Sequence, residues 1–162
     1  MAKRRHRRAA IKSDPVEIAI ESMSNEGRGV SHINGKVVFV EGALPKEIVK
    51  AAYQTNRSQY AELITTELIT QSPDRVEPPC TYAGACGGCT LQHLNNESQL
   101  TFKEDALLEQ LDHEVGLLGK DFVVLTKLRA KVLGYRRKAR LAVRHVVKKG
   151  GCLLYTSDAA DE

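Results

Sequence analysis

The pair Asn34-Gly35 constrains the fold of this chain more than any other local feature. It separates two runs of strand-forming residues, 29–33 and 36–40. Asn-Gly between such runs is typical of a two-residue β-hairpin turn, because both turn residues take positive φ angles. The sequence therefore predicts an antiparallel hairpin over residues 29–40.

Further short runs of strand-forming residues lie on both sides of this hairpin. Over residues 16–20, Val16, Ile18 and Ile20 alternate with more polar positions, which predicts a strand with one buried face. Residues 48–53 and 60–69 read as two more strands joined by a turn. Five strands within about 55 residues predict a small closed OB-like barrel over residues 13–71, since closure removes exposed strand edges.

A helix is expected to follow and to begin at Asn96. Gln99 stands three positions further on, as in a capping box. One apolar stripe runs along this helix through about Glu114, and core packing is its expected role. Its members are Leu100, Leu107, Leu108 and Leu111. With the barrel, this helix predicts a β-rich α+β fold.

Residues 126–151 hold ten basic side chains and no acidic one. From Tyr135 to Val147 apolar and basic residues alternate, which predicts a strand with one cationic face. That face consists of Arg136, Lys138, Arg140 and Arg144. Like charges on one strand face repel each other, so these four residues are candidate contacts to a nucleic acid; a solvated strand face is the alternative.

The first twelve residues form a second basic block. They hold six basic side chains and no acidic one, whereas residues 13–125 hold eight basic and seventeen acidic ones. We expect residues 1–12 to be a flexible tail. It either binds a polyanion, because neutralised phosphates release counterions, or is simply solvated.

Neither a membrane span nor a secretory signal is found. No stretch is apolar over the roughly 18 residues of a spanning helix, and the basic N-terminus lacks an apolar segment after it. A cytoplasmic protein is expected. In a reducing compartment, cysteines indicate metal binding or catalysis before disulfides.

The last eleven residues, 152–162, do not continue the pattern that precedes them. They resemble an in-frame translation of a sequencing adaptor, and such segments are excluded from fold reasoning; a genuine acidic tail is the alternative. Without them the chain has 24 basic and 17 acidic residues, a net charge of +7, and three cysteines. The reading frame is then expected to have been cut, with a region after Gly151 missing.

The three remaining cysteines form the motif C-x5-C-G-G-C at Cys80, Cys86 and Cys89. Thiolates this close together can converge on one metal centre, and the paired glycines permit tight turns with free amides near sulfur. His93 could complete a zinc site of three cysteines and one histidine. An iron–sulfur cluster with a fourth ligand further along the chain is equally consistent with the spacing.

Two turns in the barrel region resemble those of TRAM domains, which are RNA-binding barrels of tRNA- and rRNA-modifying enzymes. They are Gly-Arg-Gly at 27–29 and Gly-Ala-Leu-Pro at 42–45. The resemblance implies that residues 13–71 bind RNA. Arg28, in the first turn, is a candidate contact.

The cysteine motif, with Gln92 and His93 after it, resembles the RNA uracil-5-methyltransferase family, whose members bind S-adenosylmethionine, and is nearest to its 23S ribosomal RNA enzymes. The resemblance implies that Cys80, Cys86 and Cys89 bind a 4Fe-4S cluster within residues 72–95. His93 then becomes a packing residue. The family's fourth ligand follows the basic strand, so it is expected beyond Gly151; Cys152 is not assigned. Residues 96–151 would begin the family's central domain.

A complete member of this family would transfer a methyl group from S-adenosylmethionine to C5 of a uracil. A cysteine thiolate adds to C6, and a general base later removes the C5 proton, on a base that is single-stranded or flipped. This sequence contains no glycine-rich cofactor loop and no nucleophile outside the cluster. We therefore assign no catalytic or cofactor-binding residue, and we expect an inactive N-terminal part.

The expected partner is ribosomal RNA, with no membrane or DNA partner, and a monomer is expected. The cluster would be a structural and RNA-contacting element, because methyl transfer needs no electron acceptor. Two alternatives remain: a stand-alone TRAM-type module with a zinc site, and a tRNA-directed relative with the same chemistry.

Overall fold

The computed structural model describes residues 14–83, 89–116, 122–134, 138, 141–146 and 151–156, the last two ranges by their backbone. The chain divides into two compact units, residues 1–76 and 77–162. Within the described residues, no helix is both long enough and apolar enough to cross a membrane.

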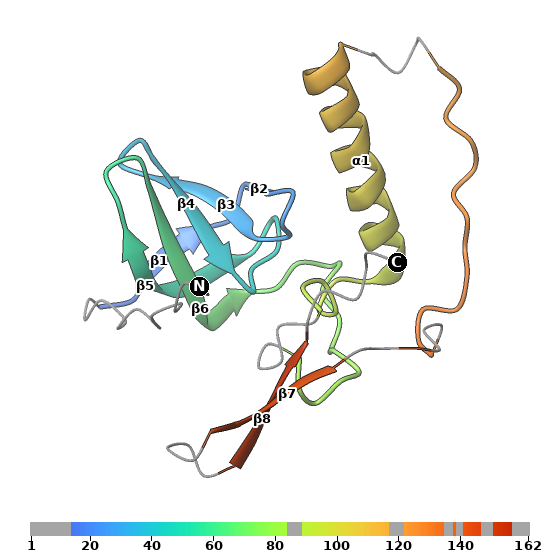
Figure 1. Ribbon diagram of the computed structural model, residues 1–162. Helices are drawn as coiled ribbons and strands as arrows, with labels where there is room; N and C mark the ends of the chain where they lie inside the picture. The colour runs from blue at the N-terminus through green and yellow to red at the C-terminus, as the bar shows by residue number, and fades with distance from the viewer. Residues whose placement is uncertain are drawn as a thin grey trace. The chain divides into compact units, whose positions relative to one another are not determined.

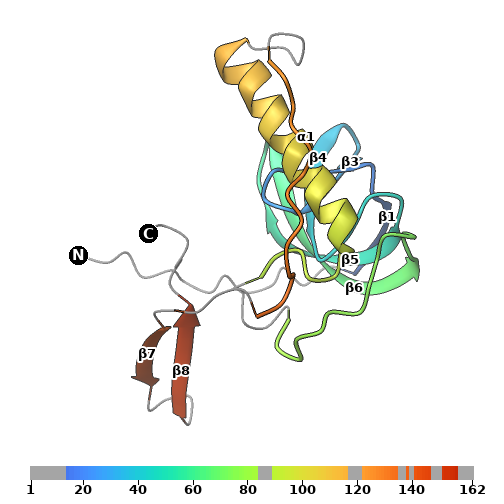
Figure 2. The ribbon, with the colours of Figure 1, turned by 90° about the vertical axis from the view of Figure 1, so that its right-hand side faces the viewer.

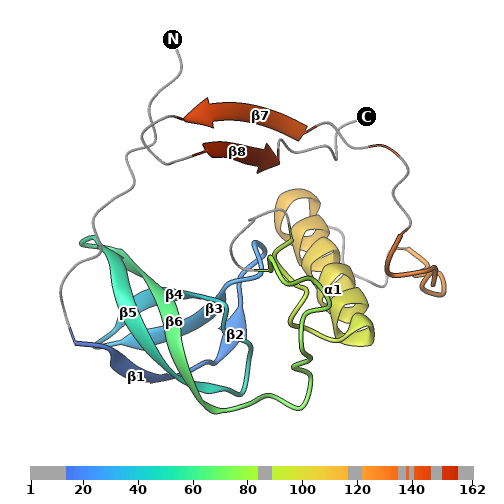
Figure 3. The same ribbon diagram turned by 90° about the horizontal axis from the view of Figure 1, so that it is seen from below.

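The first unit is a strongly curled six-stranded sheet (Figures 1 and 3). The strand order is β1-β5-β6-β4-β3-β2. Neighbouring strands are antiparallel, except that β4 and β6 run parallel. The strands are β1 (Val16–Ala19), β2 (Ser22–Met23), β3 (Gly29–Ile33), β4 (Lys36–Glu41), β5 (Ile48–Asn56) and β6 (Tyr60–Thr70).

The predicted hairpin is confirmed. Strands β3 and β4 pair from Ile33 and Lys36 onward. At the turn between them, Asn34 has a φ of 50° and Gly35 a φ of 76°. Two consecutive positive φ angles are what a type I′ turn requires, so the local chemistry of the pair fixes this part of the sheet.

The β-rich α+β class is also confirmed, with two corrections to the barrel. The sheet has six strands, whereas five were predicted. The sixth, β2, was missed because two residues are too few to produce an alternating pattern. The strand order is open rather than closed, with β1 and β2 at its two ends; we call this open, curled sheet the barrel. These two strands are consecutive pieces of one segment and cannot pair with each other; Ile20, between them, instead bonds through its amide to the carbonyl of Glu47 at 2.8 Å.

The core lies inside this curled sheet. Alternation along the strands buries Ile18, Val38, Val40, Val49 and Leu63, with Ala51 and Ala61 between them. Each such branched side chain stabilises the fold by roughly 1.5–3 kcal/mol. Position 29 has no room for a side chain, because a Cβ there would lie 2.9 Å from Ile20 Cγ2 and 3.2 Å from Ala43 Cβ.

The second unit contains helix α1 (Asn96–Val115), and its predicted start is confirmed. The cap differs from the predicted capping box. Asn95 is the N-cap, and its Oδ1 accepts from the amide of Ser98 at 2.9 Å. The Gln99 side chain instead reaches back to the carbonyl oxygens of Leu91 and Leu94, at 3.0 and 2.8 Å.

Core packing of the leucine stripe on α1 is not confirmed. No residue of the helix is buried, and Leu107 is 56% exposed. Leu94 is the only buried apolar residue in the described part of the second unit. Among the described residues, nothing covers these leucines fully.

The predicted basic strand is described only in part. Strand β7 (Leu141–Val146) pairs antiparallel with β8 (Gly151–Thr156), as Figure 2 shows. Lys138 lies outside any strand and is exposed, while residues 135–137 and 139–140 lie outside the described residues. Among the described residues, β8 pairs with residues 141–146. The adaptor-like residues thus begin inside β8, and their origin stays a prediction.

Candidate functional site

Arg28 occupies the loop between β2 and β3, and hydrogen bonds close this loop on both sides. The Ser24 amide donates to the Arg28 carbonyl at 2.8 Å, and the Gly27 amide donates to the Ser24 carbonyl at 2.7 Å. Gly27 has a φ of 77°, which a side chain would disfavour. The Gly-Arg-Gly turn therefore presents the arginine from a fixed backbone.

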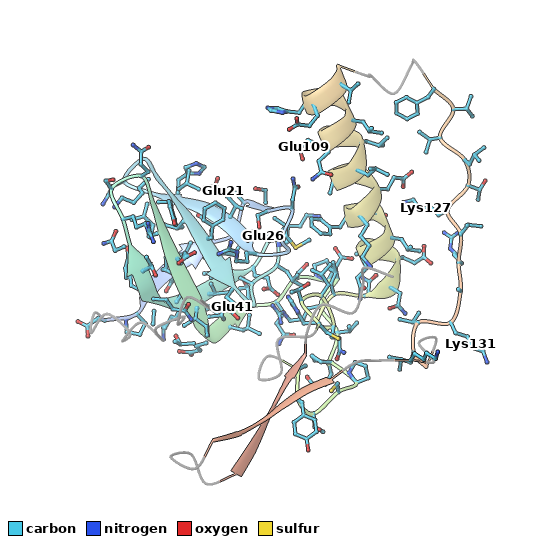
Figure 4. The ribbon with its side chains drawn as sticks, in the orientation of Figure 1. Glu21, Glu26, Glu41, Glu109, Lys127 and Lys131 are labelled. Carbon is cyan, nitrogen blue, oxygen red and sulfur yellow. The ribbon has the colours of Figure 1, made fainter. Side chains whose placement is uncertain are left out.

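The Arg28 guanidinium lies over the ring of Phe39, 5.2 Å from its centroid. It also donates to Glu62 Oε1 at 3.3 Å and to the carboxylate of Glu26. Figure 4 labels Glu26 together with Glu21 and Glu41 of the same unit. Partial burial alone would lower the pKa of Arg28, but hydrogen bonds and charges from Glu26 and Glu62 outweigh it and raise that pKa.

Phe39 and Tyr60 form an aromatic pair that sequence reasoning missed. Their ring centroids are 6.1 Å apart, in an edge-to-face arrangement at 72°. The guanidinium of Arg57 lies 5.7 Å from the centroid of the Tyr60 ring. The available signal was the outward position of Phe39 in the alternation of β4. Phe39 meets Tyr60 because β4 pairs in parallel with β6. No local sequence pattern predicts that strand pairing.

A buried carboxylate joins the barrel to the segment that leads toward the cysteines. The side chain of Glu47 is fully buried, and it accepts from Arg75 Nε at 2.5 Å and from Arg75 Nη2 at 2.8 Å. The amides of Leu44 and Ser72 donate to the same carboxylate at 2.8 and 3.2 Å. Residues 72–75 are thereby fixed against the turn at 42–45.

The electrostatics of Glu47 are dominated by these donors. Burial by itself would raise the pKa of Glu47. The hydrogen bonds from Arg75, Leu44 and Ser72, with the charge of Arg75, outweigh burial and hold that pKa below its ordinary value of 4.5. A buried charge needs such full pairing, so Glu47 is an ionised anchor of the fold.

The structure describes two of the three motif cysteines. Cys80 and Cys89 are both exposed and neither is in a disulfide. Cys86 lies outside the described residues, so the three sulfurs are not placed relative to one another. Next to them in sequence, Oε1 of Gln92 is buried and has no hydrogen-bond partner among the described residues. His93 is half-buried within the turn that leads to α1.

The remaining predicted RNA contacts are placed only in part. Lys138 is exposed, Arg136 and Arg140 lie outside the described residues, and Arg144 is described by its backbone in β7. Elsewhere in the second unit lies Lys127, which Figure 4 labels. Its Nζ is 2.6 Å from Glu104 Oε2. Arg129 forms a two-bond contact with Glu97 at 3.1 and 2.9 Å. These two cations are therefore already paired with carboxylates of α1.

Comparison with known proteins gives two findings. Residues 14–62, from β1 to the start of β6, match the TRAM domain family. The chain is also similar to proteins named 23S rRNA (uracil(1939)-C(5))-methyltransferase RlmD. It is 45% identical to that of Alkalilimnicola ehrlichii over 148 residues, which are 91% of this chain and 33% of the relative.

Two further relatives of the same name give the same result. Identity is 45% with the protein of Hahella chejuensis over 91% of this chain, and 40% with that of Methylococcus capsulatus over 90% of it. The chain spans about a third of the length of these relatives, 33% and 32% respectively. The resemblance drawn from residues 80–94 and from the two barrel turns is thereby confirmed.

Proposed function

We propose that this chain, which resembles the RNA uracil-5-methyltransferases, is the RNA-binding and 4Fe-4S-binding N-terminal part of a 23S ribosomal RNA (uracil-C5)-methyltransferase. The observation that carries the proposal is 45% identity to a 23S rRNA methyltransferase over 91% of this chain, together with the TRAM match over residues 14–62. The complete enzyme would use S-adenosylmethionine and act in the cytoplasm as a monomer.

RNA binding is assigned to the barrel and to the basic residues of the second unit. On the barrel, Arg28 is held by a closed loop and lies against an aromatic ring, a geometry suited to stacking beside a base. Arg136, Lys138, Arg140 and Arg144 would contact phosphates, which give affinity that falls with salt.

The cysteines fit an iron–sulfur cluster by their chemistry. Cys80 and Cys89 are exposed and outside any disulfide, so both thiols are free to be ligands, and Cys86 is the third. In proteins such clusters are held by cysteine thiolates. When bound, the cluster would hold residues 80–89 in one conformation near the RNA. Its fourth ligand would come from the part of the longer protein that follows Gly151.

Methyl transfer is assigned to the longer protein and not to this chain. The cofactor loop, the nucleophile and the base would lie in its C-terminal domain. A radioactive methyl-transfer assay with 23S ribosomal RNA is expected to give no product with these 162 residues alone. Product formed by this chain would contradict that part of the proposal.

The proposal is tested by anaerobic reconstitution with iron and sulfide. A brown protein containing iron and sulfide is expected, and Cys80→Ser and Cys89→Ser should each lose the colour. Tyr82→Phe is a matched control, because Tyr82 lies between the ligands and is 70% exposed. Stoichiometric, colourless zinc that is lost in a His93→Ala variant would instead favour the zinc-bearing module, for which the spacing of His93 after Cys89 is the supporting observation.

RNA binding is tested separately by fluorescence anisotropy. A labelled ribosomal RNA fragment that contains the target region should bind, with an affinity that falls as salt rises. A transfer RNA serves as the competing ligand. Tighter binding of the transfer RNA would favour a tRNA-directed relative, and no binding of either RNA would overturn the proposed function.

A further inference from the structure

We propose that the outer face of β3, β4 and β6 is a stacking surface for the bases of single-stranded RNA. We call it the stacking face and define it as Phe39 and Tyr60 with the arginines Arg28 and Arg57. Lys36 shares the row of Ile33 and the parity of the buried Val38, so it is not on this face of β4. Its Nζ reaches the Arg57 carbonyl at 2.8 Å, and we count it as a cation at the edge of the stacking face. This inference rests on the proposed function, because it assumes that the barrel binds RNA. It adds which surface of the barrel does so, and by which interaction.

The strand register turns both rings away from the core. Val30, Phe39 and Glu62 form one row across β3, β4 and β6, and His32, Val37 and Tyr60 form another. The alternating rows are buried: Ser31, Val38 and Ala61 lie between the two, and Val40 and Leu63 lie next to the row of Phe39. Successive residues of a strand point to opposite faces, so Phe39 and Tyr60 lie on the outer face, where both are half-buried.

Neither ring is part of the apolar core. The residues packed against the core cluster are Val16, Ile33, Tyr53 and Leu68, and neither Phe39 nor Tyr60 is among them. Their aromatic contacts are with each other and with the two arginines. Two aromatic side chains therefore lie partly exposed on the outer face of the sheet, where a ligand can reach them.

The edge-to-face geometry leaves part of an aromatic surface available to a base. Rings 6.1 Å apart at 72° are not stacked on one another. A base can therefore stack on such a ring, and this stacking is tolerant of sequence because every base has a π-face. The arginines beside the rings add cation–π attraction.

Two cations at the edge of the stacking face favour an anionic strand that runs along that edge. Lys36 Nζ donates to Asn56 Oδ1 at 2.9 Å and to the Arg57 carbonyl at 2.8 Å. Among the described residues neither Lys36 nor Arg57 pairs with a carboxylate. Their charges are therefore available to phosphates.

The opposite side of the stacking face is different. There Arg28 is already paired with Glu26 and Glu62. Carboxylates repel phosphates, so the phosphates are expected beside Lys36 and Arg57, with bases directed toward Phe39. This division of roles distinguishes an RNA strand from an uncharged apolar segment of a protein, which would have no use for Lys36 and Arg57.

A fluorescence experiment tests stacking directly, because the chain contains no tryptophan. The variant Tyr60→Trp keeps an aromatic ring at the centre of the stacking face and makes it the only indole in the protein. Titration with a single-stranded RNA oligonucleotide of mixed sequence should quench its emission while affinity stays near that of the unchanged chain. Ile69→Trp, on the same strand where Ile69 is 43% exposed, is the control and should not be quenched.

Affinity measurements provide the second test. Phe39→Leu and Tyr60→Leu should each weaken oligonucleotide binding by about 5- to 100-fold, which is the effect of losing one stacked base. Their salt dependence should stay unchanged. Lys36→Gln and Arg57→Gln should instead reduce the slope of log affinity against log salt by about one each. Thermal unfolding of each variant checks that the barrel is intact.

The outcomes separate this inference from the function on which it rests. If the unchanged chain binds no RNA, the proposed function fails. If it binds RNA while both leucine variants bind equally well and the Tyr60→Trp emission is not quenched, RNA binding stands and the stacking face is overturned. Weaker binding by folded leucine variants, with quenching at position 60 alone, supports it.

Discussion

The Arg75 guanidinium and the Glu47 carboxylate face each other as two forks, with Nε–Oε1 and Nη2–Oε2 distances of 2.5 and 2.8 Å. Paired N–H···O bonds of this kind add geometric specificity to the attraction of the charges. The two residues are 28 positions apart, and they hold the chain that leaves β6 against the turn before β5.

Glu47→Gln should destabilise the barrel strongly. The substitution leaves the guanidinium of Arg75, only 14% exposed, without a counter-charge, and breaking a buried pair in this way costs about 3–5 kcal/mol. Urea unfolding measures the loss. Glu67→Gln is the matched control, because it removes the same charge from an exposed pair with Lys50 and should change the free energy of unfolding far less.

Acid should weaken the barrel through Glu47. The pKa of this carboxyl is lower in the folded chain than its ordinary value of 4.5. Such a group adds stability above the unfolded pKa, and this stability is lost as pH falls through the folded pKa. The free energy of unfolding should therefore decrease below about pH 4.5, and Glu47→Gln should decrease less over that range. An identical pH dependence in both proteins would contradict the assignment.

Gly29→Ala should destabilise by overpacking. The new methyl group would meet Ile20 Cγ2 at 2.9 Å and the Ala43 carbonyl oxygen at 3.2 Å. Forcing atoms into a packed core costs about 1–3 kcal/mol. Gly35→Asn is the comparison: nothing lies within 4 Å of a Cβ at that site, and asparagine tolerates positive φ. It should keep most of the stability, as measured by the midpoint of thermal unfolding.

Glu62→Gln should strengthen RNA binding. Glu62 Oε1 lies 3.3 Å from Arg28 Nη1 and half-neutralises the cation beside the ring of Phe39. Removing this charge leaves Arg28 paired with Glu26 alone and removes a repulsion toward phosphates, so affinity should rise by about two- to fivefold, in line with the modest energies of exposed ion pairs. Anisotropy at low salt measures the effect. Glu67→Gln carries the same charge change and should leave affinity closer to that of the unchanged chain.

Limited proteolysis should begin in the second unit. Within the extended segment 122–134, Val123, Leu125 and Leu128 are 84%, 81% and 94% exposed, and such chain opens to proteases at little cost. The first fragments seen by mass spectrometry should end in this segment, with the barrel kept whole through Arg75. Early cleavage within β3 to β6, with residues 122–134 intact, would show that the burial pattern misjudges local stability.

Local chemistry decided how much of the fold could be predicted from the sequence. The turn at Asn34-Gly35 and the start of α1 depend on neighbouring residues, so both were found. The hydrogen bond from the Ile20 amide to Glu47 and the pairing of Glu47 with Arg75 each join chain segments more than twenty residues apart. No periodicity reports such contacts, and for this reason the open strand order was not foreseen.

The same distinction applies to the candidate site. Arg28 was predicted as a contact because its Gly-Arg-Gly turn resembles that of TRAM domains, and its role stays a prediction. Phe39 and Tyr60 become neighbours only through the parallel pairing of β4 with β6, which hairpin signals cannot predict. The leucine stripe of α1 was predicted from the sequence pattern. Whether other residues bury that stripe depends on tertiary structure, and within the described residues none of its leucines is buried.

The strand connections also set an order of assembly. The hairpins β3–β4 and β5–β6 join strands that are neighbours in the sequence. In contrast, β1 pairs with the distant β5, with Val16 opposite Ala51, and β4 pairs with the distant β6, with Val37 opposite Tyr60. Pairings between distant segments form slowly, because loop-closure entropy must first be overcome. During synthesis, the growing chain thus has no complete sheet until residue 70 has been added, and its first strand remains an unpaired edge until β5 arrives.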